Sequence, residues 1–236
     1  MSITPLLLLP GQLCDRRLWR DPAALLADVA EPIFGDLSRD SAIPDMAARV
    51  LKFAPERFAL AGLSMGGYVA LEIMRQAPER VTRLALLDSS ARPENPARAT
   101  LRRADMSAVS LASEAHRRFA GITPRLLPQF IHESRLNDLV AQDVMDMTAR
   151  VGPEVYMRQQ TAILARADSR PSLGNIRVPT LIGVGESDAV TPPRLAEEMA
   201  AAIPHARLHV FARCGHLPPM EDPAATAKAL RAWLAA

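Results

Sequence analysis

Short apolar runs recur along this chain, and segments with helical periodicity separate them. Six runs have the length and the continuous hydrophobicity of buried strands, namely residues 4–9, 31–35, 58–62, 83–88, 180–185 and 206–211. Strands of this kind, without alternating polar residues, are typical of parallel sheets that helices cover on both faces. The pattern therefore predicts an α/β protein with a doubly wound, mostly parallel sheet of about six strands and right-handed crossovers.

Two helix starts can be predicted from polar residues that precede a proline. Thr191 is expected to be the N-cap of one helix, with Pro192 at its first position. Asp222 and Pro223 repeat this arrangement at the start of the last helix.

One long segment breaks the alternation of strands and helices. Between residue 91 and about residue 170 no run has strand character, and the segment is rich in Ala, Arg and Leu with scattered prolines. We expect residues 91–170 to form an all-helical cap over one edge of the sheet. This cap is inserted within a single domain that spans residues 1–236.

The composition fits one globular domain of 236 residues and disfavours several other classes of protein. The formal net charge is only +2, and the cations, nearly all Arg, form no basic stripe, so nucleic-acid binding is not expected. No apolar run approaches the roughly 20 residues of a membrane span. Residues 6–9 lack the charged flank and cleavage site of a signal peptide, so we expect a cytoplasmic protein. Nothing in the pattern indicates the oligomeric state.

The sequence contains two cysteines, Cys14 and Cys214, which are too few for a disulfide framework. In the cytoplasm both thiols would be reduced. We expect both to serve as small buried hydrophobic residues rather than as nucleophiles.

The pentapeptide Gly62-Leu63-Ser64-Met65-Gly66 fits the pattern G-x-S-x-G, with a predicted strand before it and a helix after it. In such a tight turn the serine takes a strained backbone conformation that points its hydroxyl out of the sheet, and the small glycines prevent clashes. The following helix also directs its positive end toward the hydroxyl. The motif indicates a serine nucleophile, and the alternative is a glycine-rich turn with an idle serine.

With this motif and its flanking elements, the sequence resembles the α/β-hydrolase family over almost the whole chain. The family orders its catalytic residues as serine, acid and histidine. Asp188, in the loop after run 180–185, is similar to the family's acid, and His216, after the last predicted strand, is similar to its base. The resemblance therefore implies a triad of Ser64, His216 and Asp188, with no metal ion and no organic cofactor.

Two other carboxyl groups compete with Asp188 for the role of the acid. Glu186 lies in the same loop, and Asp88 ends the strand after the nucleophile helix, where some family members have their acid. The other histidines are expected on the surface, in the core or in the cap, and they are His116, His132, His205 and His209.

The loop after the first strand carries a second family signature. Pro10-Gly11 stands where many family members have His-Gly. The resemblance implies that the backbone N–H groups of Gln12 and Met65 form the oxyanion hole, with Leu13 as an alternative to Gln12.

The resemblance implies a serine hydrolase that cleaves carboxylic esters of small-to-medium apolar molecules through an acyl-enzyme intermediate. The apolar pocket is expected because the cap is mostly aliphatic. The same triad in the family also serves thioesterases, lactone and C–C bond hydrolases and acyltransferases. Another alternative is a small-molecule receptor with little turnover. The expected partner is a small ester substrate.

Overall fold

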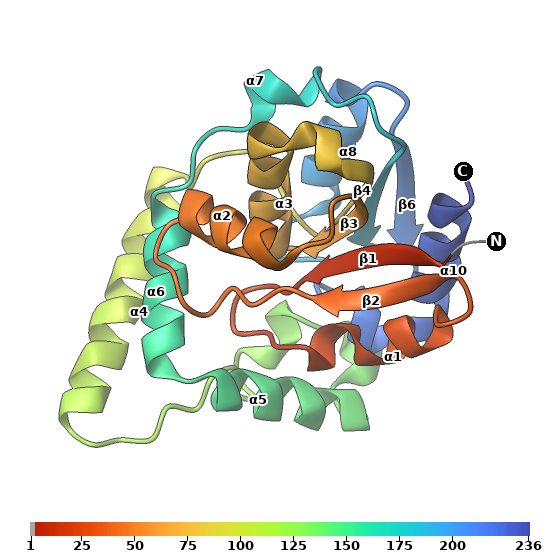
Figure 1. Cartoon of the computed structure of the whole chain (residues 1–236). Helices are drawn as coiled ribbons and strands as arrows, with labels where there is room; N and C mark the ends of the chain where they lie inside the picture. Colours follow the sequence, from red (N-terminus) through yellow and green to blue (C-terminus); the bar gives the residue numbers. More distant parts are fainter. Residues whose placement is uncertain (1–2) are drawn as a thin grey trace.

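A computed structural model describes residues 3–236 and confirms a six-stranded parallel α/β fold (Figure 1). The strand order is β2-β1-β3-β4-β5-β6, and every neighbouring pair is parallel. The strands are β1 (Thr4–Leu9), β2 (Ala30–Phe34), β3 (Phe58–Leu63), β4 (Val81–Leu87), β5 (Thr180–Gly185) and β6 (Arg207–Phe211).

Successive residues of each central strand point to opposite sides of the sheet, and these residues are mostly apolar. Helices therefore cover both faces. On one face, Leu60 of β3 belongs to a core cluster with α2 (Ile43–Phe53), α3 (Met65–Gln76) and α8 (Pro193–Ala202). On the other face, Ala59 belongs to a cluster with α1 (Arg17–Leu25) and α10 (Pro223–Leu234). Two apolar layers therefore enclose the sheet.

The two outer strands differ from the continuous buried runs that the sequence predicts. All residues of β3 and β5 are buried, whereas the first four residues of β6 are exposed and β2 is only partly buried. The prediction of a fully buried strand is wrong for β6, because β6 has a strand neighbour on one side only.

The part of the chain between β4 and β5 is helical, and residues 88–179 include no strand. Figure 1 places α4 and α6 beside the carboxyl ends of the strands. The helices of this segment are α4 (Pro96–Glu114), η2 (Leu127–Gln129), η3 (Glu133–Arg135), α5 (Leu139–Val151), α6 (Pro153–Leu164) and α7 (Arg170–Leu173). Two further short helices are η1 (Pro78–Arg80) and α9 (Pro218–Glu221).

The predicted helix starts have different outcomes. Asp222 caps α10, since its carboxylate accepts a hydrogen bond from the N–H of Ala225 at 2.8 Å. The prediction for Thr191 is wrong: α8 begins at Pro193, and the hydroxyl of Thr191 donates instead to Asp188. From residue 3 to residue 236, no helix combines the length and apolarity that a bilayer span requires.

Candidate active site

Ser64 lies in a strained turn between β3 and α3. Its backbone angles are φ 54° and ψ −116°, a conformation that is unfavourable for a residue with a side chain. A Cβ atom on Gly62 would lie 2.3 Å from the carbonyl oxygen of Gly66, and one on Gly66 would lie 2.4 Å from that of Leu9. The turn therefore requires glycine at both positions, which is the physical basis of the motif.

The loop after β1 packs against the start of α3, because Gly66 approaches the carbonyl groups of Leu9 and Pro10. In this loop the N–H of Leu13 donates to Oε1 of Gln159 at 2.9 Å and is therefore occupied. This favours Gln12 over Leu13 as an oxyanion donor. The N–H of Met65, at the first position of α3, has no acceptor within its own helix.

Asp188 and His216 form a buried pair. Nδ1 of His216 lies 2.9 Å from Oδ2 of Asp188, and the two residues are 4% and 3% exposed. Since an ionised carboxylate can only accept, Nδ1 carries the hydrogen, and Nε2 is left as an acceptor. This is the tautomer that a general base for a serine hydroxyl requires.

The Asp188 carboxylate has three further donors that the sequence did not reveal. Its Oδ1 accepts from the N–H groups of Val190 and Thr191 at 2.8 and 3.0 Å, and the Thr191 hydroxyl donates to Oδ2 at 2.7 Å. Burial opposes ionisation, but His216 and these hydrogen bonds outweigh it and hold the pKa of Asp188 below its usual value. Asp188 is therefore charged at neutral pH.

A buried glutamate holds the loop that carries His216. The Glu221 carboxylate accepts hydrogen bonds at 2.9 and 3.0 Å from the N–H groups of Gly215 and Leu217, which flank the histidine. A third bond comes from the N–H of His132 at 2.7 Å. Burial is the largest influence and raises the pKa of Glu221. The sequence showed no sign of this role, because its partners are backbone groups of other loops.

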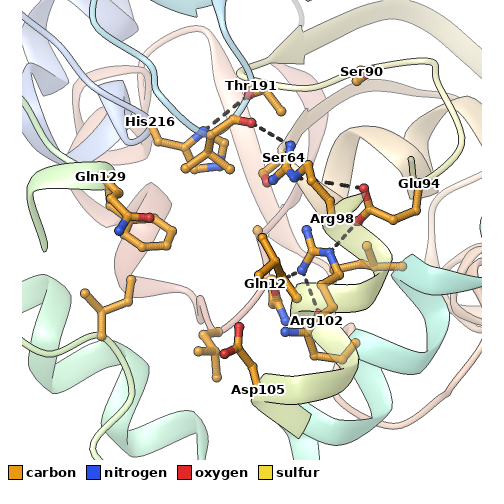
Figure 2. A pocket seen from close by; sticks show the side chains of 18 of the residues that line it. Gln12, Ser64, Ser90, Glu94, Arg98, Arg102, Asp105, Gln129, Thr191 and His216 are labelled. Carbon is orange, nitrogen blue, oxygen red and sulfur yellow. Dashed lines mark hydrogen bonds and ion pairs between the residues drawn. The ribbon is translucent and has the colours of Figure 1, made fainter. Parts of the chain in front are cut away.

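Ser64, His216, Gln12 and Thr191 line one cavity of about 780 Å³ (Figure 2). Asp188 is outside its wall and is hydrogen-bonded to His216. The structure thus gathers residues from four distant segments around one space.

The two competing carboxyl groups differ from Asp188 in their surroundings. Glu186 is exposed, and its carboxylate accepts from the N–H of Arg213 at 3.1 Å. Asp88 is completely buried and accepts from the N–H of Gly185 at 2.8 Å through Oδ1, while Oδ2 has no partner among the described residues. Burial, together with the charge of Asp188, raises the pKa of Asp88 well above its usual value. The raised pKa disfavours the ionised form of Asp88, which favours Asp188 as the acid.

Asp88, Asp188 and His216 also have the donor types of a metal site, with one donor atom of each lying within 4.8 Å of the others. Two of these groups, however, are already joined by the hydrogen bond between Nδ1 and Oδ2. The arrangement therefore fits an acid–base pair with a neutral carboxyl group behind it.

The remaining histidines and the cysteines take no part in the site chemistry. His116, His205 and His209 are exposed, and neither these three nor His132 line the cavity. Cys14 and Cys214 are buried, and burial raises the pKa of each thiol to about 12. Thiolate nucleophiles would not form at neutral pH.

The close approach at Gly62 predicts a large loss of stability in Gly62→Ala. The added methyl group would collide with backbone atoms, so we expect the free energy of unfolding to fall by at least about 2 kcal/mol in urea titrations. The control is Gly174→Ala, where the methyl group would meet nothing within 4 Å. Equal stabilities of the two variants would contradict the proposed constraint.

The raised pKa of Asp88 predicts a characteristic pH dependence of stability. Between its unfolded pKa, about 3.9, and its raised folded pKa, the folded protein holds one more proton than the unfolded chain. Wild-type stability should therefore fall relative to Asp88→Asn as the pH rises above about 4, by up to about 1.4 kcal/mol per pH unit, until the folded pKa is reached. Urea unfolding at a series of pH values measures this difference. A relative gain by the wild type would mean that Asp88 is ionised.

Comparisons with known proteins agree with this architecture. Residues 6–229 match the alpha/beta hydrolase family. A pimeloyl-(acyl-carrier protein) methyl ester esterase of Nitrosomonas europaea is 30% identical over 198 residues, which are 79% of this chain and 76% of that protein. Its counterpart from Aromatoleum aromaticum is 30% identical over 179 residues, 72% of this chain and 70% of that protein.

Solved structures show the same relationship. A thermophilic esterase from Thermogutta terrifontis has a TM-score of 0.86 and 30% identity, covering 99% of this chain and 90% of that one. The enol-lactonase of Burkholderia xenovorans has a TM-score of 0.84 at 22% identity, and the match covers 100% of this chain and 93% of the enol-lactonase. At this identity the similarity supports the fold alone. This chain belongs to the alpha/beta hydrolase family.

Proposed function

We propose that this protein is a serine hydrolase that cleaves carboxylic esters, with Ser64 as nucleophile, His216 as base and Asp188 as the orienting acid. The observation that carries the proposal is the 2.9 Å hydrogen bond between His216 and Asp188. The same histidine lines a cavity together with the strained Ser64. The esterases that are 30% identical to the chain support ester hydrolysis.

In the first half of the reaction, Nε2 of His216 accepts the hydroxyl proton of Ser64 while the oxygen attacks the ester carbonyl carbon. The negative charge of Asp188 stabilises the imidazolium that forms. The imidazolium then protonates the departing alcohol, and Ser64 is left as an acyl ester.

In the second half, the same histidine takes a proton from water while the water oxygen attacks the acyl carbon. The imidazolium then returns this proton to the Ser64 oxygen as its bond to the acyl carbon breaks, which releases the acid and restores the free hydroxyl. Each step passes through a tetrahedral oxyanion. The backbone N–H groups of Gln12 and Met65 are the donors that we assign to this oxyanion. One such donor contributes about 10²- to 10³-fold to the rate.

The cavity wall includes apolar side chains from the helical segment. They are Leu101, Val109, Phe119, Ile122, Leu126 and Phe130. We propose that residues 91–170 act as a cap that selects the substrate and that these side chains bind a small-to-medium apolar part of it. The methyl ester esterases among the relatives make an ester of a small alcohol the first class to assay. The cytoplasm remains the expected compartment.

Replacing the nucleophile tests the proposal. Wild type should hydrolyse short p-nitrophenyl esters, and Ser64→Ala should lose on the order of 10⁶-fold in kcat, as expected for a triad serine. Ser107→Ala, an exposed serine on α4 outside the cavity wall, is the control and should keep full activity. Absence of turnover by the wild type, or full activity of Ser64→Ala, would refute the proposal.

The Thr191 hydroxyl should matter for catalysis although it does not react. Thr191→Val keeps the shape but removes the hydrogen bond to Asp188, so kcat should fall about tenfold while KM changes little. Thr191→Ser restores a hydroxyl and should recover most of the activity. Steady-state kinetics and thermal unfolding of both variants separate this effect from a loss of folding. Unchanged kcat in Thr191→Val would show that the remaining donors suffice.

A further inference from the structure

One wall of the cavity gathers three arginines around a single carboxylate. Figure 2 shows two of them, Arg98 and Arg102, beside the carboxylate of Glu94. The Glu94 side chain is only 3% exposed. It forms ion pairs with Arg102, with Arg166 at 3.2 Å and with Arg98 at 4.0 Å. Three guanidinium groups and one carboxylate leave this cluster with two uncompensated positive charges.

The other acceptors of these arginines are neutral. Arg102 donates to Oε1 of Gln160 at 2.7 Å and to Oε1 of Gln12 at 3.3 Å. Arg98 donates to the carbonyl oxygen of Val190 at 2.9 Å. Neutral oxygens satisfy the donors but do not cancel the charge.

The third arginine follows the same pattern. The Arg166 side chain is 7% exposed and donates to the carbonyl groups of Arg92 and Ile163 at 3.0 and 2.9 Å. Its guanidinium also lies 4.5 Å from the centre of the Tyr68 ring. The side chain of Arg102 is 15% exposed, so two of the three guanidinium groups are largely buried. Burying like charges is unfavourable, and a bound anion would offset that cost.

The other charged residues of the cavity do not reverse this balance. Asp105 is exposed and forms no ion pair within 4 Å among the described residues. Arg194 adds a further positive charge, whereas Arg92 is paired with Glu198 at 2.8 Å. The wall therefore carries a net charge of +2, which is the sum of four positive and two negative side chains. They are Arg98, Arg102, Arg166 and Arg194, and Glu94 and Asp105.

Two donors in the cavity wall are available to a ligand. Nε2 of Gln12 is buried and has no hydrogen-bond partner among the described residues. Arg102 uses Nε and Nη1 in its hydrogen bonds to Glu94, Gln12 and Gln160, and within residues 3–236 its Nη2 has no acceptor. A guanidinium edge beside an amide N–H matches the planar acceptor pair of a carboxylate.

We propose that this wall is a subsite for a carboxylate of the substrate, so that the enzyme prefers esters that carry a second, ionised carboxyl group. Monoesters of dicarboxylic acids are the simplest members of this class. The inference rests on the proposed ester hydrolysis and adds to it a charged determinant on one wall of the cavity.

The test compares kcat/KM for monomethyl esters of dicarboxylic acids with methyl esters of monocarboxylic acids of equal chain length, at pH 8. The wild type should favour the anionic ester. Arg102→Gln should lower the ratio of anionic to neutral kcat/KM by about ten- to a hundredfold, chiefly through KM, because a charged hydrogen bond is lost. Arg102→Lys keeps the charge and should recover part of the ratio.

The control variant is Arg103→Gln, which removes a charge from the next residue of α4. Arg103 is exposed and does not line the cavity, so the ratio should stay at its wild-type value. A second series of esters carries the carboxylate on the alcohol instead of the acyl group. Preference for either anionic series supports the subsite and tells which half of the substrate it binds.

A binding measurement separates failure of the subsite from failure of the proposed activity. Adipate should bind to the Ser64→Ala protein in calorimetry, and Arg102→Gln in that background should weaken the affinity about tenfold or more. A wild type that prefers neutral esters, equal ratios for Arg102→Gln and Arg103→Gln, or no adipate binding would overturn the proposal. Ester turnover without adipate binding would overturn the subsite alone.

Discussion

The hydrogen bond between His216 and Asp188 depends on the parallel pairing of β5 with β6. Gly185 and Phe211 are partners in register at the ends of these strands, so both loops leave the sheet at the same edge. The N–H of Ser187 then donates to the carbonyl oxygen of Cys214 at 3.0 Å and ties the acid loop to the histidine loop. Without this pairing, residues that are 28 positions apart in the sequence would not share a hydrogen bond.

Ser64, the proposed nucleophile, is positioned by the same sheet through another strand pair. The N–H of Ser64 donates to the carbonyl oxygen of Leu87 at 2.9 Å, and the N–H of Asp88 donates to that of Gly183 at the same distance. These bonds extend the ladder one residue beyond the strands, and both donor residues have positive φ. The rigid central strands thus hold two strained residues that an isolated turn would release.

The elements that could be predicted from the sequence are those whose cause is local. The glycine at 62 reveals the turn because the clash that it avoids is with Gly66, four residues further on, whereas the glycine at 66 avoids the distant carbonyl group of Leu9. The roles of Thr191 and Glu221 depend on which loops meet in space, and a polar residue before a proline also fits a helix cap. The exposed face of β6 was missed for a related reason, since its place at the sheet edge is a property of strand order.

The same distinction explains why the cavity differs from the aliphatic pocket that the composition of residues 91–170 predicts. Composition averages over a segment, whereas binding depends on the few side chains that face inward. Arg98 and Arg102 are four residues apart and therefore lie on one face of α4. Their contacts with Glu94, together with those of Arg166 beyond the end of α6, concentrate positive charge in a chain whose net charge is only +2. In this carboxylic ester hydrolase the positions of the charged side chains are therefore more informative about the proposed substrate than the net charge of the chain.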